Sequence, residues 1–338
     1  MAAPHFTLSD PEWLPHRHVE GQDKIRFIHL ARTEHRQFPF LTDEYLGSGR
    51  PLHDVAAQDC LALPQAPLHF LFHSAFCGST MLLAALDRPG VAMGLSEPVL
   101  LNDVVGFRRR GAQPAQVARL TEVAMRLLAR PFAPGEAIVV KPSNLLNPQA
   151  ELMLAMRGEA RAILLHAPLE TFLISVVRKG LWCRLWVREL LEGLLIDRVV
   201  DLGFATNDYF RQSDLQVAAV GWLAQQMLFQ RLADKFGPQR VRGLDSESLT
   251  RDPAQVIAAA TQFYGLQASA QDLAEMAGGP AFTRHSKSGE AFDAARRSAD
   301  YAQARAAHGD EIDKVVVWAE AVAKANGIAM NAPLPLLG

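Results

Sequence analysis

The stretch from Leu68 to Leu86, LHFLFHSAFCGSTMLLAAL, constrains the fold of this chain most strongly. It begins with an apolar, aromatic-rich run of the length of a buried strand, and from Met81 on it has the composition of a buried helix. A short segment of small and polar residues separates the two. The sequence therefore predicts a strand, a tight loop and a helix in immediate succession.

A loop that opens a helix in this way can hold an anion. The first backbone N–H groups of a helix have no partner inside the helix, and the positive end of the helix dipole lies at the same point. Gly78 lets the backbone approach an anion closely, and the hydroxyls of Ser79 and Thr80 add donors. The alternative is an ordinary strand-to-helix turn whose serines only cap the helix.

The loop matches the nucleotide-binding pattern G-x-x-x-x-G-K-[ST] only in part. It keeps the second glycine, Gly78, and the final hydroxyl, Thr80. However, His73 stands at the first glycine position and Ser79 at the lysine position. Enzymes that hydrolyse ATP or GTP need that lysine on the β- and γ-phosphates, so we do not expect ordinary nucleoside-triphosphate hydrolysis.

Composition limits the partners and the compartment of this chain. The formal net charge of −2 over 338 residues gives no general attraction to nucleic acid or to an anionic membrane. The three cysteines are too few and too scattered for a disulfide framework or a metal site, which fits a reducing cytoplasm. The first residues lack the apolar core of a secretory signal. We expect a cytoplasmic protein without a bound metal.

Residues 60–86 carry no formal charge and are long enough to span a bilayer. Two prolines, two histidines and the Ser-Gly-Ser-Thr cluster interrupt the stretch, so the sequence argues against a membrane helix.

Strands and helices alternate along most of the chain. Short β-branched or apolar runs lie at 91–96, 137–140, 162–165 and 240–244, and segments with helical spacing lie between and after them, including 214–236 and 253–264. This alternation predicts an α/β fold with a central parallel sheet and helices on both faces. Residues 1–65 read as an N-terminal extension, with short strands or irregular structure, packed on a main domain of residues 66–338. The polar segment FTRHSKSGEAFDAARRS after Pro280 reads as a mobile loop, and a last helix is expected at 311–325.

Polar side chains follow three of the predicted strands directly. Glu97 comes after the short run that ends at Ser96, Lys141 after Ala137 to Val140, and His166 after the strand at 162–165. Since α/β sheets bind ligands beyond the carboxyl ends of their strands, these side chains are candidates for a site.

In the order of its motifs the chain resembles the sulfotransferase family, whose P-loop-like enzymes move a sulfuryl group from 3′-phosphoadenosine 5′-phosphosulfate (PAPS) to an acceptor. CGSTMLLAAL looks like the 5′-phosphosulfate loop of that family, and LLHAPLETFLIS is similar to its 3′-phosphate motif. LSEP and VVKPSN resemble the glutamate loop and the lysine strand end of its protein-tyrosine branch. LDSESLTRDP follows its Y-E-D-L-x-x-x-P pattern.

The resemblance implies a role for each matching residue. The donor would be held by residues of the loop, of the 3′-phosphate motif and of the late polar segment, namely Phe76, Cys77, Gly78, Ser79, Thr80, His166, Ser175, Arg284 and Lys287. Lys141 would supply a cation at the bridging oxygen, and Glu97 would be the general base. His73 is a second candidate base, and Arg178 and Lys179 are candidates for extra positive charge.

Each of these residues also has an ordinary interpretation. Lys141 can be a solvated strand-end lysine, Glu97 a helix-cap acid, His73 a core histidine bonded to a carbonyl, and Ser175 a helix serine bonded back to a carbonyl. Cys77 can be an activated thiol at a helix N-terminus or, as we prefer, a small residue that fits the turn.

Two departures from the family pattern concern donor binding. Phe76 replaces the usual Arg or Lys of the loop, and His166 replaces the arginine of the 3′-phosphate motif. Each loss removes a charge-assisted hydrogen bond of roughly 1.5–3 kcal/mol. The alternatives are therefore a small-molecule kinase or other P-loop transferase, and a nucleotide-binding or partner protein that kept the fold without catalysis.

The acceptor of such an enzyme is expected to be a small molecule or a peptide. Its pocket would lie between residues 97–110 and the helices of 181–236, where several aromatic residues can line an apolar cavity or belong to the core. These are Trp182, Trp186, Tyr209 and Phe210. The arginine triplet at 108–110 reads as a solvated turn.

Overall fold

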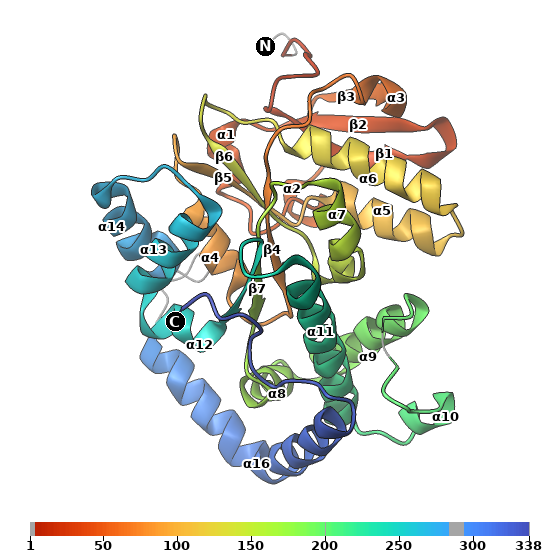
Figure 1. The fold of residues 1–338 in the computed structure, drawn as a ribbon, viewed down its shortest axis with the longest axis vertical. Coiled ribbons are helices and arrows are strands. Elements are labelled where there is room, and N and C mark those ends of the chain that lie inside the picture. The colour runs from red at the N-terminus through yellow and green to blue at the C-terminus, as the bar shows by residue number, and fades with distance from the viewer. Residues whose placement is uncertain (1–3, 200, 284–293, 338) are drawn as a thin grey trace.

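A five-stranded parallel sheet forms the centre of the protein in a computed structural model that describes residues 4–199, 201–283 and 294–337 (Figure 1). The strand order is β5-β6-β4-β7-β8. The strands are β4 (His69–His73), β5 (Ala92–Ser96), β6 (Ala137–Lys141), β7 (Ala162–His166) and β8 (Val241–Asp245). Ser96 pairs with Lys141, and His166 with Asp245, so the carboxyl ends of the strands lie along one edge of the sheet.

Helices cover both faces of the sheet, as the sequence predicts. Leu71 and Ile163 point to one face, where they pack with the apolar sides of α4, α8, α11 and α13. Phe70 and Leu164 point to the other face, toward α5, α6 and α7. Strands buried on both faces need continuous apolar runs, which these strands have. The predicted α/β three-layer architecture is confirmed.

The helix bounds complete the description of the fold. The helices are α1 (Arg32–His35), α2 (Asp43–Leu46), α3 (Ala57–Cys60), α4 (Ser79–Leu86), α5 (Val99–Arg109), α6 (Pro114–Leu128), α7 (Ala150–Met156), α8 (Leu169–Arg178), α9 (Leu181–Ile196), α10 (Thr206–Tyr209), α11 (Asp214–Phe236), α12 (Ser246–Arg251), α13 (Pro253–Tyr264), α14 (Ala270–Gly278), α15 (Pro280–Thr283) and α16 (Ala294–Ala325), with short 3-10 turns η1 (Glu20–Gln22) and η2 (Asn144–Gln149). The bounds predicted for α11 and α13 agree with the structure.

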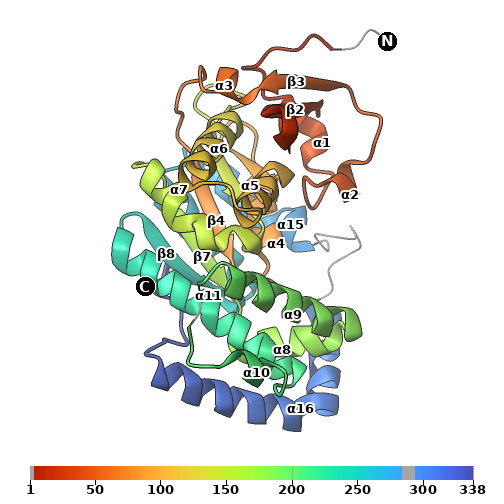
Figure 2. The same ribbon diagram turned by 90° about the vertical axis from the view of Figure 1, so that its right-hand side faces the viewer.

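The N-terminal residues build a second, antiparallel sheet of β1 (Trp13–Val19), β2 (Lys24–His29) and β3 (Leu52–Ala56) (Figure 2). Ile25 and Phe27 share an apolar cluster with Val104 of α5 and Val117 of α6, so this sheet packs against the helices of the central domain. Residues 38–45 are expected to be short strands or irregular; residues 38–42 are irregular, and the short helix α2 replaces that structure from Asp43 on.

The prediction of a polar loop after Pro280 is also wrong for the residues at its two ends, which are helical. Its central residues, 284–293, lie outside the described residues. α15 precedes that gap, and α16 begins at Ala294 rather than at the predicted Glu311. The early part of α16 is rich in alanine and charged residues, which favour a helix without marking an apolar stripe. Across the described ranges, no helix is both long and apolar enough to cross a membrane.

Candidate functional site

The site lies at the carboxyl ends of β4 and its neighbours β6 and β7. The chain leaves β4 toward β5 on one side of the sheet and leaves β7 toward β8 on the other. A reversal of this kind opens a crevice between the loops that follow the two strands, where α/β proteins place ligands. The loop after β4, residues 74–78, enters this crevice and leads into α4.

The backbone of this loop is strained. Ala75, Phe76 and Gly78 have φ of 77°, 51° and 78°, in the left-handed region, while Cys77 between them does not. Left-handed geometry costs a non-glycine residue about 1–2 kcal/mol, and such strain gathers at functional sites. Only from Phe76 to Gly78 does the left-handed region alternate with another conformation, and such alternation turns successive N–H groups toward one point in anion-binding nests.

Hydroxyl groups border the same loop. Ser79 and Thr80 begin α4, as the sequence predicts, and Gly78 is the N-cap. Ser74 is fully buried, and its Oγ has no hydrogen-bond partner among the described residues. A buried hydroxyl without a partner is costly unless a ligand supplies one. The loop therefore offers hydrogen-bond donors that suit a terminal phosphate or sulfate group.

Phe76 and Cys77 have packing roles in this structure. The Phe76 ring lies 5.9 Å from that of Phe172 in α8 and 5.3 Å from that of Trp186 in α9. Lys179 Nζ lies 5.2 Å from the centre of the Phe76 ring, so a cation stands beside the position where the family motif has Arg or Lys. Burial raises the pKa of the Cys77 thiol, which argues against an activated thiolate.

Lys141 and Glu97 form an ion pair beside the loop. The Lys141 side chain is 0% exposed and that of Glu97 is 18% exposed. The backbone N–H of Glu97 donates to the carbonyl oxygen of Lys141 at 2.7 Å, and Glu97 has a left-handed φ of 49°. The ordinary interpretation of Lys141 as a solvated lysine is thus wrong.

His73 connects the loop to this ion pair. Its Nδ1 accepts from the backbone N–H of Ala75 at 3.3 Å, which leaves the proton of a neutral ring on Nε2, 3.1 Å from the carbonyl oxygen of Pro142. Nε2 also lies 3.7 Å from Glu97 Oε1. Because both ring nitrogens have partners, this arrangement favours a positioning role for His73 over the role of a base.

Two residues of the site were missed at the level of sequence. The Phe40 ring, from the N-terminal segment, lies 5.0 Å from Lys141 Nζ. Asn147 of η2 donates to the carbonyl oxygen of His73 at 2.9 Å and to Gln225 Oε1 at 3.1 Å. The P-S-N run after Lys141 ends at Asn144, so no motif marks either Asn147 or Phe40.

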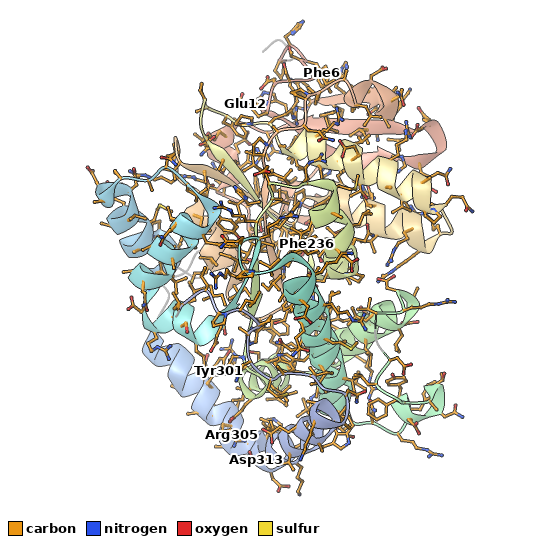
Figure 3. All side chains as sticks on the ribbon, viewed as in Figure 1. Phe6, Glu12, Phe236, Tyr301, Arg305 and Asp313 are labelled. Atoms are coloured by element: carbon orange, nitrogen blue, oxygen red, sulfur yellow. The ribbon has the colours of Figure 1, made fainter. Side chains whose placement is uncertain are left out.

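Ser175 and Arg178, both predicted near a 3′-phosphate, have partners on α16. Burial lowers the pKa of His166 to about 4, so its imidazole is neutral at pH 7. Ser175 is buried, and its Oγ lies 2.7 Å from the hydroxyl of Tyr301 in α16. Figure 3 labels Tyr301 on that helix. Arg178 pairs with Asp300 at 3.2 Å. The other two predicted residues, Arg284 and Lys287, lie outside the described residues.

The predicted acceptor region is more exposed than expected. Trp182 is 63% exposed and Phe210 84% exposed, so neither belongs to the core. Arg108 and Arg109 pair with Asp197 after α9, which corrects their interpretation as a solvated turn. These ion pairs join α5 to the end of α9.

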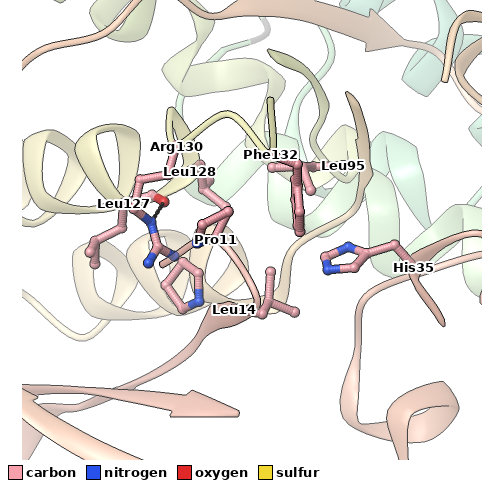
Figure 4. A pocket seen from close by; sticks show the side chains of 9 residues that line it. Pro11, Leu14, His35, Leu95, Leu127, Leu128, Arg130 and Phe132 are labelled. Atoms are coloured by element: carbon pink, nitrogen blue, oxygen red, sulfur yellow. Dashed lines mark hydrogen bonds between the residues drawn. The ribbon is translucent and has the colours of Figure 1, made fainter. Parts of the chain in front are cut away.

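A small cavity lies elsewhere, between residues 11–15 and the end of α6. It is lined among others by Leu14, His35, Arg130 and Phe132 (Figure 4). The centre of a water molecule could move within about 10 Å³ of this cavity, which is room for one water. It is too small for an acceptor. Within the described residues, no group of three or more potential metal ligands is present.

Comparison with known proteins gives similarity only among solved structures. No family profile matches the chain, and no curated protein matches its sequence. The sulfotransferase domain of the Synechococcus PCC 7002 olefin synthase matches with a TM-score of 0.39 and 16% identity, over 65% of this chain and 81% of that chain. Sulfotransferase STF9 from Mycobacterium avium matches with a TM-score of 0.41 and 12% identity, over 74% of this chain and 79% of that chain. Sulfotransferase STF1 from Mycobacterium tuberculosis matches with a TM-score of 0.42 and 14% identity, over 65% of this chain and 73% of that chain. Such values describe a distant similarity of architecture, so a functional conclusion must come from the site.

Proposed function

We propose that this protein transfers a sulfuryl group from a phosphosulfate nucleotide, PAPS or a close relative, to a hydroxyl or amine acceptor. One observation carries the proposal: the buried ammonium of Lys141 lies with Glu97 beside a strained strand-to-helix loop whose N–H groups suit an anion. The sequence motifs around the loop, Glu97 and Lys141 support the same function.

Each part of the site has a distinct task in this reaction. The bound donor supplies an activated sulfuryl group. The backbone of residues 76–80 and the hydroxyls of Ser79 and Thr80 hold its oxygens. The Lys141 ammonium is fully buried, so it acts on the charge that grows on the leaving group through its electric field rather than through a contact. Glu97 accepts the proton of the acceptor hydroxyl or amine. The acceptor can reach the Glu97 carboxylate because that side chain is partly exposed.

The residues at the loop fit the phosphosulfate end of the donor, whereas the predicted 3′-phosphate residues do not fit that phosphate. His166 is neutral and buried, and the hydroxyl of Ser175 is engaged by Tyr301. A donor held mainly through its phosphosulfate end agrees with both facts.

Calorimetric titration with 3′-phosphoadenosine 5′-phosphate, the spent donor, tests this function. We expect binding that Ser79→Ala weakens about tenfold or more, because a hydrogen bond to a charged group contributes roughly 1.5–3 kcal/mol. Lys141→Met should also weaken binding, because the loop loses the positive charge beside it. Lys235→Met is the matched control, since Lys235 is an exposed lysine of α11 that pairs with Glu151. It should leave the affinity unchanged. Absence of binding at millimolar ligand would overturn the proposal.

A further inference from the structure

The N-terminal segment of residues 38–46 is hydrogen-bonded to the loop that carries Glu97. Ser96 Oγ donates to the carbonyl oxygen of Pro39 at 2.6 Å, and the backbone N–H of Leu41 donates to the carbonyl oxygen of Ser96 at 2.7 Å. The N–H of Val99 donates to the carbonyl oxygen of Leu41 at 3.1 Å. These bonds hold the residues on both sides of Phe40 to the residues on both sides of Glu97.

The Phe40 ring is directed at Lys141 by this attachment. Its centre lies 5.0 Å from Lys141 Nζ, within the range of a cation–π interaction. The Tyr45 ring meets the Phe40 ring edge-on, with centres 5.5 Å apart, and supports its orientation. The ammonium of Lys141 is therefore bounded by the carboxylate of Glu97 and by an aromatic face.

A buried ammonium needs such neighbours. Removing a charge from water is costly, and the cost is offset only by good partners in fixed geometry. A carboxylate with partial access to solvent leaves one side of the ammonium open to water unless another group covers it. The Phe40 ring covers part of the ammonium.

We propose that Phe40 is a positioning residue of this site: its ring seals the Lys141 ammonium from water and holds it against Glu97. The N-terminal segment then completes a site whose other parts all come from the central sheet. The consequence for catalysis rests on the proposed function, but the sealing of Lys141 does not.

The sealing can be measured on the protein without any nucleotide. Acylation of lysine amines by acetic anhydride, followed by mass spectrometry of peptides, gives a rate for Lys141 relative to Lys314, whose side chain is 74% exposed. Phe40→Ala should raise that relative rate about tenfold, because water and reagent gain access to the amine. Phe40→Leu keeps most of the volume but not the π face, and should raise it about threefold.

Phe38→Leu is the matched control for these variants. Phe38 lies two residues away and its ring faces another cation, Arg50, at 5.5 Å. This variant should leave the Lys141 rate unchanged. Thermal unfolding checks that each variant folds, and if Phe40→Ala does not fold, Phe40→Leu alone decides.

The outcomes separate this inference from the proposed function. An unchanged Lys141 rate in the folded Phe40 variants overturns the role of Phe40, whether or not the protein binds 3′-phosphoadenosine 5′-phosphate. A raised rate in a protein that does not bind this nucleotide supports the role of Phe40 and overturns only the proposed function.

Discussion

Lys141 and Glu97 contact each other twice, once through a backbone hydrogen bond between the ends of β6 and β5 and once through their charged side chains. The backbone hydrogen bond holds the two Cα atoms close together, and the ion pair allows the lysine to be buried completely. The two partners differ in exposure, because water reaches the carboxylate but not the ammonium. This asymmetry predicts that the two residues respond differently to substitution.

Removing Glu97 should destabilise the protein more than removing Lys141. Glu97→Ala leaves a buried ammonium without its counter-charge, which typically costs about 3–5 kcal/mol. Lys141→Met leaves a carboxylate that still reaches water, so we expect a loss of about 1–2 kcal/mol. Urea unfolding followed by tryptophan fluorescence measures both. The exposed pair of Lys235 and Glu151 is the control, and its removal should change stability by less than about 1 kcal/mol. Equal losses for Glu97→Ala and Lys141→Met would contradict the asymmetry.

Relief of strain in the loop should stabilise the protein. Ala75 has a φ of 77°, which glycine adopts freely, so Ala75→Gly should raise the free energy of unfolding by up to about 1 kcal/mol. The same substitution at the exposed helical residue Ala84 should lower it by about 1 kcal/mol, because glycine disfavours a helix interior. Chemical denaturation of the two variants side by side gives the comparison. A loss of stability in Ala75→Gly would mean that the left-handed backbone is not strained there.

The central sheet could be predicted from the sequence because its signals are local. Continuous apolar runs such as that of β4 and the helical spacing of α11 need only a window of a few residues to be recognised. The same is true of the loop at Gly78, where a small residue follows a strand and hydroxyls open a helix. Lys141 and Glu97 could be placed at one edge because parallel strands align their carboxyl ends.

Contacts between distant segments could not be predicted in this way. Phe40 reaches Lys141 from the segment between α1 and α2, and Tyr301 reaches Ser175 across 126 residues of sequence. No local pattern records such a contact, since it depends on how whole elements pack. The charge of His166 depends on burial in the same way, because burial and not the residue type makes it neutral at pH 7.

The stability of the protein should depend on pH through its buried histidines. Burial lowers the pKa of His166 from 6.5 to about 4. Above pH 6.5 neither the folded nor the unfolded state carries this proton. Between pH 6.5 and 4 the unfolded state takes it up first, so stability falls by about 1.4 kcal/mol per pH unit for such a group. His35 and His69 have pKa values lowered to about 4 by burial and act in the same direction.

Substitution of His166 isolates its share of this effect. Between pH 6.5 and 4.5 the free energy of unfolding of His166→Gln should fall by about 2 kcal/mol less than that of the unmodified protein, whatever the stability of the variant at pH 7. His5→Gln, at an exposed position, should keep the full loss. Urea unfolding of the three proteins at both pH values gives the three losses of stability to be compared. If His166→Gln and the unmodified protein lose the same amount, His166 is not held neutral by burial.

The engagement of Ser175 by Tyr301 predicts weak selectivity for a 3′-phosphate. In this structure the Ser175 hydroxyl is buried against Tyr301, the Arg178 guanidinium is paired with Asp300, and His166 carries no charge at pH 7. A nucleotide with a 3′-phosphate therefore gains no charge-assisted hydrogen bond from these residues, each of which would be worth roughly 1.5–3 kcal/mol. We expect 3′-phosphoadenosine 5′-phosphate and adenosine 5′-phosphate to bind within about threefold of each other. Calorimetric titration of both nucleotides makes the comparison, with Ser175→Ala as the variant that should change neither affinity. A preference above about tenfold that Ser175→Ala abolishes would mean that α16 moves away from Ser175 when the nucleotide binds.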